Sequence, residues 1–486
     1  MKLKLRQTSL FMLLGIMTLA FGVRVFGLAE QSFTADEVAE IGIARTSLLD
    51  ILHTRDGFPP LYHFILHGWL RLFNSDLAAR WLSALLGCAS VFAMWQLAPG
   101  LEGRKEKFWT AFLLALSPFH IWYSQEARAY VLYFFFALLA LGFFSRAWQF
   151  DRKQDWLAYA LAGIAGLFTH YFFAILLALN AALLALFKRK PAQPLLIFTV
   201  HLAIALSGLI AAWLFVEDIA YQTACVITRT PFDFAALGYT LFTFIAGYSL
   251  GRSLRELHFM SLYEALPEFL PWLALLSGGL FALLFAVRQN RRGNETVPGA
   301  LLFALILIPV LLCGALTEML RVSFKTQYLM WAAIPLLVWL GRRLARLAPR
   351  WRMSIAVSAL GLMFAAAFYN RNFVARYQNE DVQNLALYLQ VKGPAPVLVL
   401  ADYMENSVRH YLQNDWAVHA LPAIGKEGQG LEQTLKLIQA NPAPLWLVYT
   451  RPFHGDPGGR FKSALFEKGL VQKQIRFAGI ELYQVK

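Results

Sequence analysis

An acidic pair, Asp36-Glu37, follows the first long apolar stretch of the chain, and a third acid, Glu126, stands in a later polar run. A carboxylate within hydrogen-bond reach can accept the proton that a hydroxyl or amine loses when it attacks an electrophile. A carboxylate placed where a helix leaves a bilayer can meet both a lipid in the membrane and a polar molecule in water. Loops after apolar spans are often polar, so an ordinary exposed loop is the alternative interpretation.

Further charged and aromatic side chains lie at the ends of apolar stretches that we expect on the same side as Asp36. Arginine and lysine there suit a lipid phosphate, which they neutralise through charge-assisted hydrogen bonds. The alternatives are an interfacial ion pair, a polar turn, and cations whose apolar stems cover the membrane edge. The candidates, in chain order, are Tyr62 and His63, Arg128 and Tyr130 beside Glu126, the pair His170-Tyr171, and Arg321, Lys325 and Tyr328.

The composition indicates the elements that must position these residues. Of 486 residues, 58% are hydrophobic and 15% are charged, which is typical of a membrane protein. Apolar runs of roughly 17–25 residues, the length that crosses a bilayer as a helix, recur along the chain. We predict eleven spans, near 8–28, 79–98, 108–121, 129–147, 156–170, 171–187, 195–216, 270–288, 298–316, 327–341 and 353–370.

The distribution of lysine and arginine predicts the orientation of these spans. Basic residues collect in every second loop, as they do in cytoplasmic loops. This places the N-terminus in the cytoplasm and the C-terminus outside, in a multi-pass protein of the inner (plasma) membrane. The net charge of +14 is then largely a topology signal and does not indicate a nucleic-acid partner.

We expect two domains. Residues 1–372 form the membrane domain, with long outer loops at 29–78 and 217–269, and the short apolar run Leu61–Phe73 lies in the membrane interface. Residues 373–486 form a small extracytoplasmic α/β domain, because short apolar strands alternate with helical patterns. Strands are expected at 397–400, 445–449 and within 474–485, and helices at 385–391, 404–413, 429–440 and 460–469. This tail has no glycine-rich phosphate loop of either common type, so we assign it no nucleotide.

Together these residues resemble the GT-C glycosyltransferases, in particular the bacterial branch similar to protein O-mannosyltransferases and lipid A aminoarabinose transferases. The resemblance covers residues 10–345 well and the tail only in broad type. Two positions depart from the family pattern: Gln327 stands where members often carry arginine, and Phe58 where they often carry a polar residue. The matching features are Arg24, Asp36-Glu37, the run Pro59-Pro60-Leu61-Tyr62, Arg80, the run Ser124–Tyr130, His170-Tyr171 and Tyr328.

The resemblance implies a GT-C fold, a polyprenyl-phosphate sugar donor, and a lipid, glycan or protein acceptor reached from the extracytoplasmic side. Asp36 takes the place of the catalytic acid and Glu126 that of the second acid.

The chemistry also follows from the residue types. Phosphate leaves without protonation, so one base, Asp36, suffices to activate the acceptor, and a single displacement inverts the sugar. Glu37 and Glu126 could orient the sugar. Any metal would be Mg²⁺ or Mn²⁺, with Asp36 and Glu126 as ligands, while Arg128, Arg321 and Lys325 hold the phosphate.

The main alternative is a transporter or flippase of lipid-linked glycans. Such a protein needs polar or ionisable groups near the membrane midplane. The predicted spans are poor in them, with Asn180 and His201 among the few.

Overall fold

The computed structural model divides the chain into two compact units, each with its own hydrophobic core. Unit 1 comprises Met1–Phe26, Ile43–Leu250 and Leu266–Ala367, and unit 2 comprises Gly27–Gly42, Gly251–Ala265 and Phe368–Lys486. The structure describes residues 2–54, 56–98, 103–186, 193–214, 216, 230–288, 299–347, 350–412, 415–425, 427–440 and 445–486.

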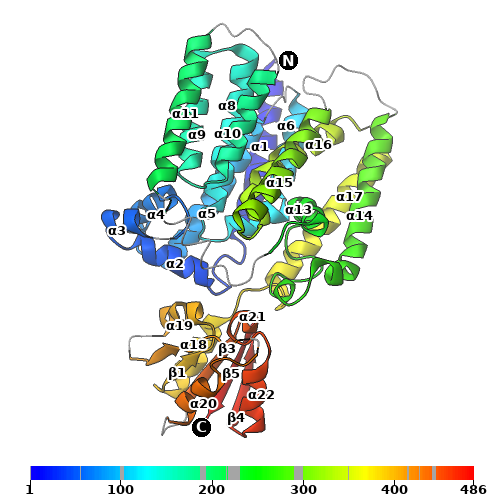
Figure 1. Ribbon diagram of the computed structural model, residues 1–486. Coiled ribbons are helices and arrows are strands. Elements are labelled where there is room, and N and C mark those ends of the chain that lie inside the picture. The colour runs from blue at the N-terminus through cyan, green and yellow to red at the C-terminus, as the bar shows by residue number, and fades with distance from the viewer. Residues whose placement is uncertain are drawn as a thin grey trace. The chain divides into compact units, whose positions relative to one another are not determined.

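Unit 1 is built from helices (Figure 1). The helices α2 (Ala35–Ala44), α14 (Leu262–Arg288) and α17 (Arg350–Phe373) each run from one unit into the other. The remaining helices of unit 1 are α1 (Lys2–Val25), α3 (Leu48–His53), α4 (Leu61–Leu72), α5 (Asp76–Leu97), α6 (Arg104–Ala115), α7 (Pro118–Ser124), α8 (Tyr130–Phe150), α9 (Lys153–Leu167), α10 (Phe173–Leu186), α11 (Pro194–Leu214), α13 (Phe234–Ala246), α15 (Gly299–Leu320), the 3₁₀ helix η2 (Thr326–Ala332) and α16 (Ala333–Ala345).

Within the described residues, six helices are long and apolar enough to cross a membrane: α5, α8, α11, α14, α15 and α17. Three shorter apolar segments, Ser9–Val25, Phe173–Leu186 and Phe234–Ala246, lie in α1, α10 and α13. The helical membrane architecture therefore agrees with the sequence, while the count of eleven spans stays a prediction. The segment predicted as 108–121 is divided between α6 and α7, because Pro118 starts a new helix.

The outer segment expected at 217–269 is not a simple loop. Residues 217–229 lie outside the described residues, but Phe234–Ala246 forms helix α13 and α14 already begins at Leu262. Asp233 caps α13 by accepting a hydrogen bond from the backbone N–H of Ala236, at 2.8 Å. Helix α4 confirms the short apolar helix that the sequence places after the two prolines.

Unit 2 contains a five-stranded mixed sheet in the order β2-β1-β3-β5-β4, which confirms the predicted α/β tail. Strands β2, β1 and β3 are parallel, and β5 pairs antiparallel with both β3 and β4. The sequence did not predict β2, a strand of only three residues. The elements are η1 (Glu256–His258), α18 (Val382–Lys392), β1 (Val397–Val399), η3 (Asp402–Met404), α19 (Glu405–Tyr411), β2 (Val418–Ala420), α20 (Leu431–Gln439), β3 (Leu445–Thr450), α21 (Pro452–Gly455), α22 (Arg460–Glu467), β4 (Val471–Phe477) and β5 (Ile480–Val485).

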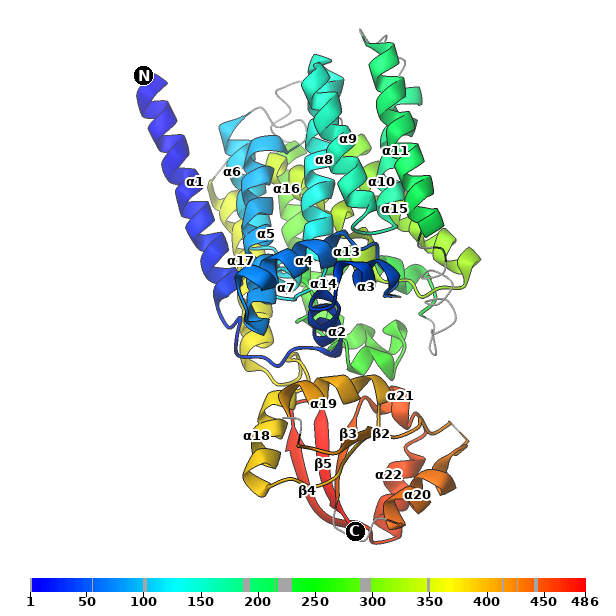
Figure 2. The same ribbon diagram turned by 90° about the vertical axis from the view of Figure 1, so that its left-hand side faces the viewer.

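The sheet is covered on both faces, and the central strand β3 shows why. All six of its residues are buried, and alternate side chains point to opposite faces. Trp446 and Val448 pack in one core with α18 and α19, whereas Leu447 and Tyr449 pack in the other with α20 and α22. Figure 2 shows α18 on one side of the sheet and α20 and α22 on the other.

The tail also binds the loop that carries the acidic pair. Asn379 donates its backbone N–H to the side-chain oxygen of Gln31, at 3.1 Å, and Gln383 donates its own to Ser32 Oγ, at 3.0 Å. The N–H of Phe33 donates to the hydroxyl of Tyr411, at 2.7 Å. These bonds make residues 27–42 part of the tail unit, although they are more than 300 positions away in the sequence.

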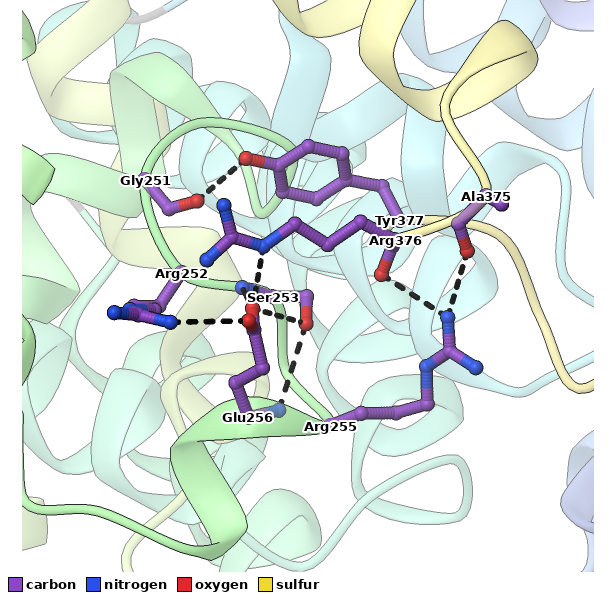
Figure 3. A network of polar contacts seen from close by, with 8 residues as sticks. All are labelled: Gly251, Arg252, Ser253, Arg255, Glu256, Ala375, Arg376 and Tyr377. Carbon is purple, nitrogen blue, oxygen red and sulfur yellow. Dashed lines mark hydrogen bonds and ion pairs between the residues drawn. The ribbon is translucent and has the colours of Figure 1, made fainter. Parts of the chain in front are cut away.

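A second segment, residues 251–256, is held to residues 375–377 by a polar network (Figure 3). Glu256 accepts hydrogen bonds from Arg376 Nε at 2.6 Å, from Arg252 Nη1 at 3.2 Å, and from the backbone and hydroxyl of Ser253. Tyr377 donates its hydroxyl to the carbonyl of Gly251. Partial burial opposes ionisation of Glu256, but the bond from Arg376 and those from Ser253 outweigh it and lower its pKa to about 2.

We expect Glu256→Gln to destabilise the protein at neutral pH by roughly 1 kcal/mol or less, because a pair this exposed is screened by solvent. The carboxylate stabilises the folded state above its ordinary pKa of 4.5, and this contribution is lost as the pH falls toward about 2. The unfolding midpoints of wild type and variant, followed by intrinsic fluorescence at pH 7, 4 and 2.5, should therefore converge at low pH.

Glu467→Gln is the matched control, since Glu467 is exposed on α22. It should leave the midpoint unchanged at each pH. A difference between wild type and Glu256→Gln that stays constant from pH 7 to pH 2.5 would contradict the assigned role of Glu256.

Candidate functional site

The run Ser124–Tyr130 connects α7 to α8, and its first residues are structural. The side-chain amide of Gln125 donates toward three backbone carbonyls at the end of α1, those of Val23, Arg24 and Phe26, at 3.4, 3.2 and 2.8 Å. Carbonyls in the last turn of a helix have no partner within the helix, so Gln125 satisfies groups that burial would otherwise leave unpaired. This contact fixes the position of the segment that carries Glu126 and Arg128.

Arg24 fixes the same region from the side of α1. Its guanidinium is fully buried and donates to the carbonyls of Ala20, Ala115 and Leu114, at 3.0, 3.0 and 3.2 Å. Its Nη2 also lies 2.9 Å from His120 Nδ1. Arginine has no acceptor, so Nδ1 of His120 must accept this bond. Arg24 therefore joins α1 to the end of α6 and to α7.

Arg128 lies over two aromatic rings brought from different parts of the chain. Its guanidinium carbon is 5.2 Å from the ring centre of Phe58 and 5.7 Å from that of Tyr130. These distances are within the range of cation–π attraction. Phe58, which departs from the family pattern, also contacts His170 at 5.2 Å between ring centres.

His170 is the centre of this aromatic cluster. Its ring stacks on Tyr133 at 4.7 Å with an angle of 27°, and lies 5.3 Å from Tyr328 and 6.1 Å from Tyr130. Tyr133 donates its hydroxyl to the backbone carbonyl of Tyr328, at 2.7 Å. Phe172 stacks on Tyr328, at 4.8 Å and 15°. Side chains more than 150 positions apart thus form one cluster.

The structure brings together four of the predicted binding residues: Arg128, Tyr130, His170 and Tyr328. Tyr171 follows His170 in the same turn. The sequence did not identify Tyr133 or Phe172 as members, because aromatic residues in or beside apolar helices carry no distinctive pattern. We call the set Phe58, Arg128, Tyr130, Tyr133, His170, Phe172 and Tyr328 the aromatic cluster.

The segment before α4 brings an acidic side chain, Asp56, close to His63 at the start of α4. His63 Nε2 lies 3.5 Å from Asp56 Oδ2, and His63 is almost fully buried. Tyr62 is wholly buried beside it. The backbone N–H of Leu61 donates to the carbonyl of Phe168 at 3.0 Å, which ties this segment to the end of α9. Asp56 was not predicted, although an acid in an outer loop is a usable signal.

The two predicted cations Arg321 and Lys325 lie on the connection between α15 and η2. Both side chains are exposed, and neither has an ion-pair partner in the part of the chain that the structure describes. Arg321 has a positive φ of 57°, the left-handed conformation that ends many helices. The adjacent Phe324 is held in place by a backbone bond of 3.0 Å to Thr230.

The acidic pair opens α2, and its two members differ. Glu37 is fully buried, accepts the backbone N–H of Thr34 at 2.9 Å, and donates its own N–H to Thr34 Oγ1 at 3.2 Å. This reciprocal pattern is a capping box, which gives Glu37 a structural role. Asp36 is exposed. Asp36 belongs to unit 2 and Glu126 to unit 1, so their convergence stays a prediction.

Comparisons with known proteins bear on the family and on the fold. Residues 58–215 match the model of the family described as dolichyl-phosphate-mannose-protein mannosyltransferase. No curated protein matches the chain.

Among solved structures, ArnT from Cupriavidus metallidurans in the apo state is 13% identical, has a TM-score of 0.60, and is covered over 97% of both chains. The same enzyme bound to undecaprenyl phosphate has a TM-score of 0.55. The oligosaccharyltransferase AglB from Archaeoglobus fulgidus, in complex with an inhibitory peptide and a dolichol-phosphate, is 11% identical with a TM-score of 0.54. The match covers 99% of this chain and 74% of that one.

At these identities the structural likeness shows the fold. Together with the family model it confirms the predicted resemblance to GT-C glycosyltransferases.

We expect Gln125→Leu to destabilise the protein by about 1–3 kcal/mol, because it removes the donor to the buried carbonyl of Arg24 and to its two part-buried neighbours. The thermal unfolding midpoint in detergent measures the effect, and hydrogen exchange over residues 120–130 should increase. Gln154→Leu, a matched change at an exposed position of α9, should alter neither quantity. An unchanged midpoint in Gln125→Leu would contradict the assigned role of this amide.

Proposed function

We propose that this chain transfers a sugar from a polyprenyl-phosphate donor to an acceptor on the extracytoplasmic side of the plasma membrane. The observation that carries the proposal is the aromatic cluster, in which Arg128 lies over aromatic rings beside His170 and Tyr328. All of its members except Tyr328 lie in the segment that matches the mannosyltransferase family model. Two structures of the same fold contain a polyprenyl phosphate, which supports this donor class.

In the proposed reaction the lipid phosphate is bound by Arg128, Arg321 and Lys325. Guanidinium and ammonium groups offset the negative charge that grows on the phosphate as the glycosidic C–O bond breaks. Tyr62, His63, Tyr130, His170, Tyr171 and Tyr328 surround the sugar and the phosphate.

Asp36 accepts the proton of the acceptor hydroxyl or amine while that group attacks the anomeric carbon. The new bond forms on the face opposite the departing phosphate, so one displacement inverts the configuration. Glu126 orients the sugar, and Glu37 holds the start of α2 and thereby Asp36. The exposure of Asp36 and the burial of Glu37 support this division of roles.

The reaction written in this way requires no metal. Asp36 and Glu126 offer the carboxylate oxygens that Mg²⁺ and Mn²⁺ prefer, and they fit such an ion by donor type. A bound ion would contribute positive charge to the leaving phosphate. The acceptor class, whether lipid, glycan or protein, stays open.

We expect Asp36→Asn to lower the rate of sugar transfer about 10²–10⁴-fold while expression is unchanged, because the amide cannot take the proton. The assay is transfer from a radiolabelled polyprenyl-phosphate sugar by purified protein in detergent. Glu30→Gln, the same change of charge at an exposed site in the same loop, should retain activity. Unchanged transfer by Asp36→Asn would refute the assignment of the base, and a wild type that moves donor without turnover would favour the flippase alternative.

A single displacement also fixes the stereochemistry of the product. The anomeric configuration in the product, read from its NMR coupling constants, should be opposite to that in the donor. A retained configuration would exclude the one-step mechanism, because retention requires two successive inversions.

A further inference from the structure

A cleft in unit 2 has no role in the reaction as proposed. One wall comes from residues 251–265, with Arg255, Glu256 and Phe259. The other comes from the tail, with Glu380, Arg451 and Phe453. Charged groups and aromatic rings line the same cleft, a combination that is common where proteins bind small polar ligands.

Both carboxylates of the cleft already have arginine partners. Glu380 is almost fully buried and accepts two parallel hydrogen bonds from Arg451, at 2.9 and 3.0 Å. Burial opposes ionisation of Glu380, but the charge and the hydrogen bonds of Arg451 keep its pKa below the ordinary value. Glu256 is paired with Arg376 and Arg252. Together with Arg255, these three arginines carry four positive charges, whereas the two glutamates carry two negative charges. The group therefore has a net charge of +2.

The cation without a carboxylate of its own is Arg255. Its Nη2 donates to the backbone carbonyls of Ala375 and Arg376, at 2.7 and 3.1 Å (Figure 3). Carbonyls hold the guanidinium in place without neutralising its charge. Within the described residues, Nε and Nη1 have no hydrogen-bond partner. Burial lowers the pKa of Arg255, as does the neighbouring Arg451, in spite of the opposing charge of Glu380.

The turn between β4 and β5 is shaped to receive this guanidinium. Gly479 has a φ of +69°, which favours glycine. A Cβ atom at this position would overlap Nη1 of Arg255, so a side chain there would displace the guanidinium. Arg255 is therefore held before any ligand arrives, which lowers the entropic cost of binding.

Aromatic rings from both walls of the cleft pack together. His258 stacks on Phe453 at 4.2 Å and 13°, and Phe259 meets the edge of the same ring at 5.7 Å. Phe259 is 58% exposed, so most of its ring remains available for contact. Exposed rings of this kind pack against the apolar faces of other rings.

The cleft and the proposed base belong to the same unit. Arg451 donates to the hydroxyl of Tyr403 at 3.5 Å and lies over its ring. Burial raises the pKa of Tyr403, against the opposing charge and hydrogen bond of Arg451. A group bound beside Arg451 would thus be held on the unit that carries Asp36, the proposed base for the acceptor.

We propose that this cleft binds an oxyanion, a phosphate or a carboxylate, that the acceptor carries next to a ring. The unpaired edge of Arg255 would bind the oxyanion, and Phe259 and Phe453 would pack on the ring. This inference rests on the proposed glycosyl transfer and adds the chemical class of its acceptor.

The test measures binding of phenyl phosphate to the full-length protein in nanodiscs by saturation-transfer NMR, with phenyl β-glucoside as the uncharged comparison. Wild type should bind phenyl phosphate and not the glucoside. Arg255→Gln should weaken binding about tenfold or more, because it removes a charge-assisted hydrogen bond. Arg460→Gln, the same change at an exposed position of α22 outside the cleft, should bind as wild type does.

Arg255→Lys keeps the charge but loses the forked geometry, and it should bind with intermediate affinity. This variant keeps the test decisive if Arg255→Gln does not fold, which thermal unfolding would reveal. Phenyl phosphate binding that is absent in wild type, or equal in wild type and both Arg255 variants, would overturn the proposal.

Nanodiscs of phosphatidylglycerol and of phosphatidylcholine distinguish two sources of the anion. If the natural ligand is a lipid headgroup, phosphatidylglycerol should compete with phenyl phosphate, whereas equal affinity in both membranes indicates a soluble group. The readout requires no turnover. Failure to bind while sugar transfer is intact would therefore overturn this inference alone.

Discussion

The site in unit 1 depends on the pairing of buried polar groups where α1 ends. The amide of Gln125 and the guanidinium of Arg24 together donate to backbone carbonyls at the ends of α1 and α6. A buried carbonyl without a hydrogen-bond donor destabilises the folded state. These bonds therefore favour one position of Gln125 and Arg24 relative to α1 and α6. They set the start of α8, and with it the position of Arg128 against Phe58 and Tyr130.

The sequence was most informative where charge stands against an apolar background. The structure divides the run Ser124–Tyr130: Ser124 and Gln125 support helices, while Arg128 and Tyr130 join the aromatic cluster. Phe58 was noted only as a departure from the family pattern, yet it contacts both Arg128 and His170. Tyr133 and Phe172 could not have been found, because their roles arise from contacts between distant helices.

The fold also contains elements that the sequence predicts and elements that it does not. The long strands β3 and β5 were predicted because they bury continuous or alternating apolar residues, whereas the three residues of β2 gave no pattern. Helix α13 lies in a region that the sequence predicts as a loop, because charged residues flank the helix on both sides. The capping box of Glu37 has a local sequence signature, Thr34 followed by an acid three residues later, which the sequence reading did not use.

The tail binds two segments that carry acids, residues 27–42 through Tyr411 and Asn379, and residues 251–256 through hydrogen bonds of Arg255 and Arg376. Asp36 thus belongs to the α/β unit and the aromatic cluster to the helical unit. The central claim is that the aromatic cluster binds the phosphate of a polyprenyl-phosphate sugar donor. A structure of the full-length protein with bound polyprenyl phosphate tests it most directly: we predict the phosphate within hydrogen-bond reach of Arg128. A phosphate bound away from the aromatic cluster would contradict the account.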